Sequence, residues 1–191
     1  SAGILRSLIP ERVRFQNYPD ALTRIPFWNY LKNTLIVSIV PVIGQVIASS
    51  LAAYSFTKIP WKGGKVLFLI ALSTMMLPSQ VTMIPLYATW VKFHAINTFW
   101  PLILPSFFGG AYNIFLLKQF YSTIPASYLD AARIDGAGEF TILTRIMMPL
   151  SKPILTTISL FTFIGGWNEF MNALLYLESD HYTLAIGLQV F

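Results

Sequence analysis

The chain has 191 residues, of which 55% are hydrophobic and 11% are charged, and its formal net charge is +5. An ordinary soluble domain carries about 25% charged residues, so this composition excludes most soluble classes and favours a membrane protein. The cations flank apolar segments and form no basic run, which indicates lipid headgroups and not nucleic acid as their partner. The chain has no cysteine, and therefore no disulfide or thiol chemistry.

Residues 1–31 precede the first apolar segment and hold four arginines and three prolines. This composition predicts an extramembrane entry segment with short helices. The aromatic run at 27–30 suits the level of the lipid headgroups, where the chain would enter the membrane.

Four later segments are apolar enough to cross a hydrocarbon core of ~30 Å as helices, which takes about 20 residues each. Each carries Ser, Thr, Gly, Asn or Pro, which suits packing against other helices better than lipid on every side. The predicted spans lie near residues 33–57, 65–91, 98–121 and 153–177.

The second predicted span contains Pro78 and Pro85. Proline removes a backbone donor and kinks a helix, so we expect this span to be broken or bent around Pro78–Pro85. A helix that tolerates its prolines is the alternative. Lys and Arg in the short loops after the first and third spans favour the cytoplasm as the side of those loops.

The stretch between the third and fourth spans, residues 122–151, is polar and rich in small residues. Pro125 can open a helix there, and residues 127–134 can continue it. Gly136 follows where a left-handed residue commonly ends a helix. Apolar residues at helical spacing predict a second short helix near 139–148.

The spacing in this stretch resembles the docking loop of ABC importer permeases, written E-A-A-x3-G-x9-I-x-L-P in that family. Five of the seven fixed residues match, and the departures are Asp130 for Glu and Met148 for Leu. The resemblance implies a cytoplasmic two-helix loop that inserts into a cleft on an ATP-binding subunit, with Ala131 and Ala132 as a low-profile contact face. Judged by spacing alone, an interfacial helix-turn-helix lying on the membrane is an equal alternative. The docking residues implied by the resemblance are Asp130, Ala131, Ala132, Arg133, Asp135, Gly136, Ile146 and Pro149.

The resemblance covers most of the chain, and the chain is similar to the carbohydrate-uptake branch of the family. It implies a type I importer permease-like helical bundle that forms one transmembrane domain over residues 1–191, without the family's first and last spans. The segments that carry it, besides the docking loop, are 33–37, 51–56, 75–78, 84–87, 149–153, 167–170 and 183–188.

Glu169 is the one acid that falls within a predicted span, and an ionisable group there usually faces the bundle interior or water. The functional interpretation places Trp167, Asn168 and Glu169 on the solute pathway or its gate. The alternative is a hydrogen bond that fixes helix packing. Tyr112 and Asn113 are a second pathway candidate, for which a packing role is the alternative.

Catalysis by this chain is not predicted. Its two histidines, His94 and His181, lie in loops, and no second acid shares a span with Glu169. No G-x4-G-K-[ST] phosphate loop occurs, and no cluster has the spacing of metal ligands. We therefore expect no metal or cofactor in this chain, and the resemblance implies that partner subunits hold ATP and Mg²⁺.

Together these observations predict an all-helical, multi-pass subunit of an importer for a sugar or sugar-like solute. The resemblance implies two ATP-binding subunits, a second and distinct permease chain and an extracytoplasmic solute-binding protein as partners. It places the complex in the inner membrane of a bacterium or archaeon, in contact with lipid. The alternatives are a permease for a glycerol phosphate ester or polyol, and a membrane scaffold that transports nothing.

Overall fold

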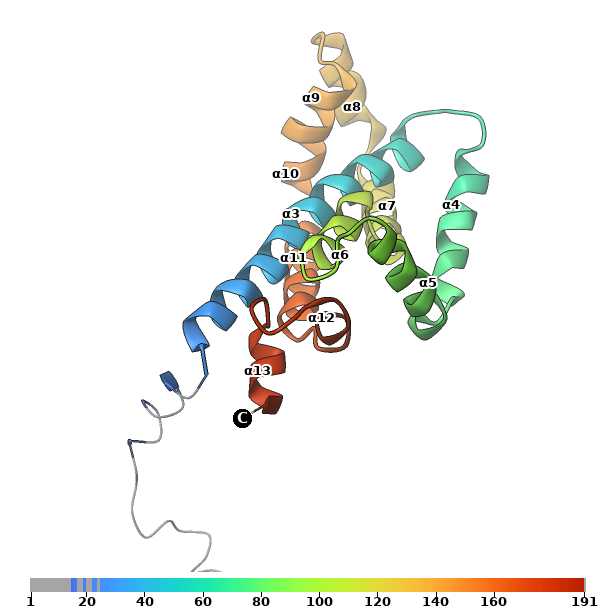
Figure 1. The fold of residues 1–191 in the computed structure, drawn as a ribbon. Coiled ribbons are helices and arrows are strands. Elements are labelled where there is room, and N and C mark those ends of the chain that lie inside the picture. The colour runs from blue at the N-terminus through green and yellow to red at the C-terminus, as the bar shows by residue number, and fades with distance from the viewer. Residues whose placement is uncertain (1–14, 17–18, 20–21, 24, 191) are drawn as a thin grey trace, which may run out of the picture.

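The computed structural model describes residues 15–16, 19, 22–23 and 25–190, and every element in this part of the chain is a helix (Figure 1). Most of the predicted entry segment lies outside the described residues. The helices are α3 (Phe27–Lys58), α4 (Gly64–Ser73), η1 (Thr74–Met76), α5 (Ser79–Lys92), α6 (Trp100–Ile103), η2 (Leu104–Phe108), α7 (Ala111–Thr123), α8 (Ala126–Ile134), α9 (Glu139–Ile142), the π-helical turn η3 (Leu143–Met147), α10 (Met148–Leu150), α11 (Lys152–Trp167), α12 (Met171–Tyr176) and α13 (Leu184–Val190).

The first predicted span is confirmed as α3, which is longer than expected at 32 residues. It starts at Phe27, so the aromatic run expected at the membrane entry forms its first turns. Pro41 lies inside α3 without ending the helix. In Figure 1 this helix runs diagonally through the molecule, and most other elements lie along it.

The second predicted span is bent, as expected. Its two halves, α4 with η1 and then α5, meet at an angle of 101°. The break falls at Leu77–Pro78, whose residues have extended backbone angles, whereas Pro85 lies inside α5 without ending it. In α4 and α5, all of whose residues are described, none is buried.

The third predicted span is confirmed as a 24-residue stretch, Trp100–Thr123, built from α6, η2 and α7. The fourth is only partly right. The helix α11 ends at Trp167 after 16 residues, and α12 begins four residues later. One reason is that the Asn168 side chain donates to the Ile164 carbonyl at 2.8 Å, beside two consecutive glycines that weaken the helix.

By length and hydropathy, two of the described helices can cross a bilayer on their own. The number rises to four if each bent pair counts as one span. The second bent pair joins Glu139–Leu150 to α11 at 82°. Figure 1 shows α8 and α9 projecting at one end of the molecule, beside the end of α3, with α12 and α13 at the opposite end.

The helices α3 and α11 cross in contact at Gly166. A Cβ atom added there would lie 2.8 Å from the Val37 carbonyl oxygen and 2.9 Å from the Ser38 Cα. Helices in a membrane associate through such small residues, because lipid tails are as apolar as leucine and only close packing favours contact. This crossing places α3 against the helix that follows the predicted docking loop.

Candidate functional site

The predicted docking loop is a hairpin of two short helices, as the sequence indicated. The first helix, α8, ends at Ile134, and the turn follows at Asp135 and Gly136. Gly136 has φ +83°, the left-handed conformation expected for it, and its amide donates to the Arg133 carbonyl at 3.0 Å. The second helix begins at Glu139 and continues to Leu150 through a π-helical turn. We call residues 125–150 the docking hairpin.

The inner face of the docking hairpin packs into the largest apolar core. Leu129 and Ala132 from α8 join Ile142 and Met147 of the second helix in this core. Ala132 is buried, so the expected low-profile face formed by both alanines is wrong: only Ala131 is exposed. Leu143 of the second helix also belongs to this core. The other core residues come from the membrane helices and their ends, and they are Ala53, Tyr54, Leu117, Tyr121, Ile124 and Ile158.

The remaining predicted docking residues differ in their surroundings. Ile146 is half-buried and packs against this same core. Asp130, Asp135 and Pro149 are exposed. Pro149 lies in the short helix α10, one residue before the second helix of the hairpin ends at Leu150.

A chain of polar contacts joins the docking hairpin to α3. The buried Tyr54 hydroxyl donates a short hydrogen bond to Glu139 Oε2. Glu139 Oε1 accepts from Arg133 Nε at 3.0 Å, and Arg133 Nη1 donates to Asp130 Oδ1 at 3.3 Å. Of these, the sequence singled out Asp130 and Arg133. Glu139 and Tyr54 are separated by 85 residues, and no sequence signal connects them.

These contacts hold the pKa of the Glu139 carboxyl below its usual value, first through the hydrogen bond from Arg133 and then through that from Tyr54. A lowered carboxyl pKa stabilises the folded state above the unfolded pKa. That stabilisation is present at neutral pH and is lost as the pH falls through the folded pKa. Both ion-pair partners of Arg133 are exposed, so solvent weakens each pair.

Three large apolar side chains of the docking hairpin are open to solvent, among exposed charged residues such as Asp130 and Asp135. Ile134 is 86% exposed, and Phe140 and Tyr128 are also exposed. All three lie on the hairpin, away from the core that its inner face builds. Large exposed apolar side chains at the end of a short projecting hairpin are typical of a protein contact.

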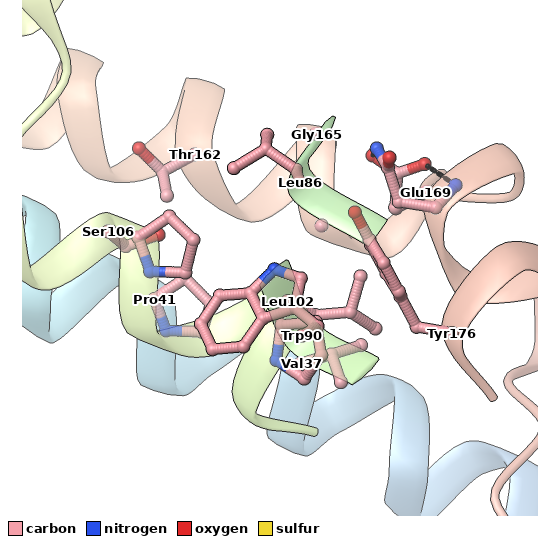
Figure 2. A pocket seen from close by; sticks show the side chains of 14 residues that line it. Val37, Pro41, Leu86, Trp90, Leu102, Ser106, Thr162, Gly165, Glu169 and Tyr176 are labelled. Atoms are coloured by element: carbon pink, nitrogen blue, oxygen red, sulfur yellow. Dashed lines mark hydrogen bonds between the residues drawn. The ribbon is translucent and has the colours of Figure 1, made fainter. Parts of the chain in front are cut away.

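A cavity of about 430 Å³ lies between α3, α5, α6, η2, α11 and α12. Figure 2 shows the Trp90 indole and the Tyr176 ring in its wall, with Glu169 close to Tyr176. The lining residues include one acid and no lysine or arginine. They are Val37, Pro41, Leu86, Trp90, Pro101, Leu102, Pro105, Ser106, Thr162, Gly165, Gly166, Glu169, Asn172 and Tyr176.

Glu169 lies in the break between α11 and α12, and not within a helix as the sequence indicated. Its carboxylate accepts from the Asn172 amide and from Asn172 Nδ2, both at 3.0 Å. These bonds are local and support the first turn of α12, and they do not tie two helices together as the packing interpretation proposed. The residue also lines the cavity, as the pathway interpretation requires.

The other pathway candidates do not line this cavity. Trp167 packs against Phe163 with ring centroids 5.7 Å apart, and Asn168 caps α11. Tyr112 and Asn113 lie in the first turn of α7, where Tyr112 is exposed. Sequence reasoning missed Trp90, Tyr176 and Asn172, because only the folded chain brings α5 and α12 to one cavity.

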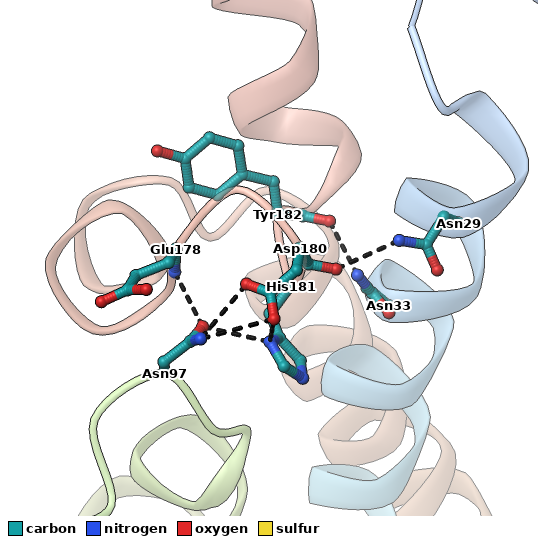
Figure 3. A network of polar contacts seen from close by, with 7 residues as sticks. All are labelled: Asn29, Asn33, Asn97, Glu178, Asp180, His181 and Tyr182. Carbon is teal, nitrogen blue, oxygen red and sulfur yellow. Dashed lines mark hydrogen bonds and ion pairs between the residues drawn. The ribbon is translucent and has the colours of Figure 1, made fainter.

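At the end opposite the docking hairpin, Asn97 joins the turn before α6 to the loop before α13 (Figure 3). Asn97 has φ +57°, and its Oδ1 accepts from the Glu178 amide at 3.0 Å. Its Nδ2 donates to the Asp180 carboxylate at 3.2 Å and helps to lower the pKa of that group. His181 Nδ1 lies 2.9 Å from Asp180 Oδ2. We call residues 177–183 the far-end loop.

The described chain is thus a helical membrane protein with a projecting hairpin at one end, a cavity among its helices and a clamped loop at the other end. Residues 45–189 match the family described as the inner membrane component of binding-protein-dependent transport systems. The chain belongs to this family, as the resemblance implied.

Individual relatives support the membership. The chain is 37% identical over 181 residues to a probable ABC transporter permease protein of Pyrococcus horikoshii, which covers 93% of this chain and 66% of that protein. It is 34% identical over 188 residues to the arabinooligosaccharides transport system permease protein AraQ of Halalkalibacterium halodurans, covering 97% and 67%. The chain therefore spans about two thirds of the length of these relatives.

A solved structure shows the same fold. It is the crystal structure of a bacterial ABC transporter involved in the import of the acidic polysaccharide alginate. One of its chains aligns with a TM-score of 0.83 and 30% identity, covering 95% of this chain and 63% of that chain. The predicted fold class, an all-helical type I importer permease, is confirmed.

Proposed function

We propose that this chain is the membrane-spanning subunit of an ATP-driven importer in the inner membrane, and that its solute is a sugar or sugar-like molecule. The docking hairpin carries the proposal: its inner face is part of the core of the membrane helices, while its outer face offers exposed apolar side chains to a partner. A scaffold without transport would leave this arrangement, and the cavity beside Glu169, without a use.

The partners in this proposal are two ATP-binding subunits, a second permease chain and an extracytoplasmic solute-binding protein. The ATP-binding subunits would hold ATP and Mg²⁺ and carry out hydrolysis, and the docking hairpin would meet them on the cytoplasmic side. The docking contact would use the exposed Ile134, Phe140 and Tyr128, together with Ala131 and Asp135.

The cavity supports a sugar-like solute by its chemistry. Aromatic rings such as Trp90 stack on the apolar C–H faces of a sugar, and a carboxylate such as Glu169 accepts hydrogen bonds from its hydroxyls. A phosphate ester is less suited, because Glu169 would repel it and no lysine or arginine is among the lining residues.

The docking role is tested by Ile134→Ser in the complex purified from native membranes in mild detergent. Because Ile134 is 86% exposed, its replacement should leave the fold unchanged but remove apolar contact area from the interface. We expect at least a tenfold loss of ATP-binding subunit, identified by mass spectrometry and by ATP hydrolysis.

The control for this test is Phe93→Ser, which removes a comparably exposed apolar side chain, 71% exposed, at the end of α5 far from the hairpin. It should retain the ATP-binding subunit. Full retention by the Ile134→Ser complex as well would count against docking at this hairpin.

The pathway role is tested by Glu169→Gln and Glu169→Leu. Glutamine keeps an oxygen that can accept from the Asn172 amide, so the complex should assemble normally while uptake from a panel of labelled oligosaccharides changes severalfold. Leucine also loses the hydrogen bond from the first turn of α12, at a cost of about 1 kcal/mol, and should lower the thermal stability in detergent. Normal uptake by both variants would remove Glu169 from the pathway.

A further inference from the structure

The helix α3 is fastened to the docking hairpin at its C-terminal end. The Tyr54 hydroxyl donates to Glu139, and Lys58 Nζ donates to the Ile124 carbonyl at 2.8 Å, immediately before the hairpin begins. Ala53 and Tyr54 also belong to the apolar core that the hairpin's inner face builds. Polar and apolar contacts thus hold the hairpin and this end of α3 together.

The same helix is fastened to the far-end loop at its N-terminal end. Asn29 Nδ2 donates to the Asp180 carbonyl at 3.1 Å, and Asn33 Nδ2 donates to the Tyr182 carbonyl at 3.0 Å (Figure 3). Just beyond this loop, the Leu184 amide donates to Thr34 Oγ1 at 2.9 Å. Three polar side chains of α3, of which Asn33 and Thr34 are buried and Asn29 is exposed, thus hold this segment through its backbone.

Between these two ends α3 is one uninterrupted helix of 32 residues, a length of roughly 48 Å at 1.5 Å per residue. The covalent route from the hairpin to the far-end loop is less stiff. It bends by 82° where α11 begins and is interrupted between Trp167 and Met171. On its way, α3 contributes Val37 and Pro41 to the cavity wall.

We propose that α3 is the lever that transmits movement of the docking hairpin to the far-end loop, with Tyr54 and Asn33 as the positioning residues at its two joints. This inference rests on the proposed function, in which the hairpin follows an ATP-binding subunit. Movement along α3 would change the cavity wall and the far-end loop together, because both are attached to the same rigid element.

The experiment uses the purified complex with its ATP-binding subunits. Since the chain has no cysteine of its own, spin labels attach to it only at cysteines that are introduced. We choose two exposed positions, Lys65→Cys on α4 and Ser179→Cys on the far-end loop. The distance between the labels is measured by double electron–electron resonance without nucleotide and with ATP plus vanadate. ATP hydrolysis, subunit content and thermal stability are measured on the same samples.

We expect the distance in the otherwise unchanged complex to shift when ATP and vanadate are added. Tyr54→Phe, which keeps the ring and removes one hydroxyl, should reduce this shift at least twofold while ATP hydrolysis stays within twofold. Asn33→Ala should do the same from the other joint. Because the joints act in series, the double variant should be little worse than the more severe single variant.

The matched control is Tyr30→Phe, which removes a hydroxyl from another buried tyrosine of α3 that has no hydrogen-bond partner for it among the described residues. This variant should keep the full shift.

An undiminished shift in Tyr54→Phe and Asn33→Ala, or an equal loss in the control, would contradict the proposal that α3 acts as a lever. A parallel loss of the ATP-binding subunit would also overturn it, because Tyr54 would then serve docking and not transmission. If the chain without substitutions bound no ATP-binding subunit, that result would contradict the proposed function itself.

Discussion

Replacing Gly166 by alanine should separate α3 from α11 and destabilise the protein by about 1–3 kcal/mol, the usual cost of overpacking a close contact. The added Cβ would lie 2.8 Å from the backbone oxygen of Val37, and backbone cannot rotate away as a flexible side chain can. Valine at this position should prevent stable folding. The measurement is the midpoint of thermal unfolding in detergent, with size-exclusion chromatography for assembly.

The neighbouring glycine is a control with the opposite expected sign. A Cβ at Gly165 would meet nothing within 4 Å, so Gly165→Ala should gain about 0.5–1 kcal/mol from the better helix propensity of alanine. If both alanine variants had the same stability, the close crossing at Gly166 would be contradicted.

Replacing Gly136 by threonine should uncouple ATP hydrolysis from uptake in proteoliposomes. Gly136 has φ +83°, a conformation that costs a β-branched residue on the order of 1–3 kcal/mol. The turn would relax and shift Ile134 relative to Phe140, which breaks up the exposed apolar face of the hairpin. We expect solute uptake per ATP hydrolysed to fall at least fivefold.

Gly138 provides the matched control two residues further on. It has φ −74° at the N-cap of α9, with nothing within 4 Å of an added Cβ, and threonine is a good N-cap residue. Gly138→Thr should therefore transport normally. Unchanged transport by Gly136→Thr would mean that the shape of this turn does not matter for coupling.

The predictions from sequence succeeded where local chemistry decides the structure. Length and hydropathy predicted α3 and the third span, because about 20 apolar residues must form a helix to cross a bilayer. Pro78 predicted the bend of the second span, and Gly136 predicted the left-handed turn of the docking hairpin. Each of these signals acts within a few residues of its own position.

The fourth span was predicted too long for a local reason that hydropathy does not detect. Residues 153–177 are apolar enough to be one helix, but the two glycines and the Asn168 side chain end α11 at Trp167. Glu169 therefore lies between two helices beside a cavity, where it accepts from the first turn of α12, and not within a helix. The residue was singled out correctly, while its surroundings were not.

The sequence by itself determined that this is a helical membrane protein with a hairpin of two short helices between its third and fourth apolar segments, since composition, span length and turn residues are local properties. Only the tertiary structure decided which face of each helix is buried. In α3 the small and polar Thr34, Ser38 and Ser49 are buried while Ile39 and Ile43 are exposed. Lipid is as apolar as isoleucine, so close packing and hydrogen bonds select the inner face, and hydrophobicity does not. The Tyr54–Glu139 hydrogen bond could not be predicted from the sequence either, because its partners meet only when α3 and the docking hairpin pack together.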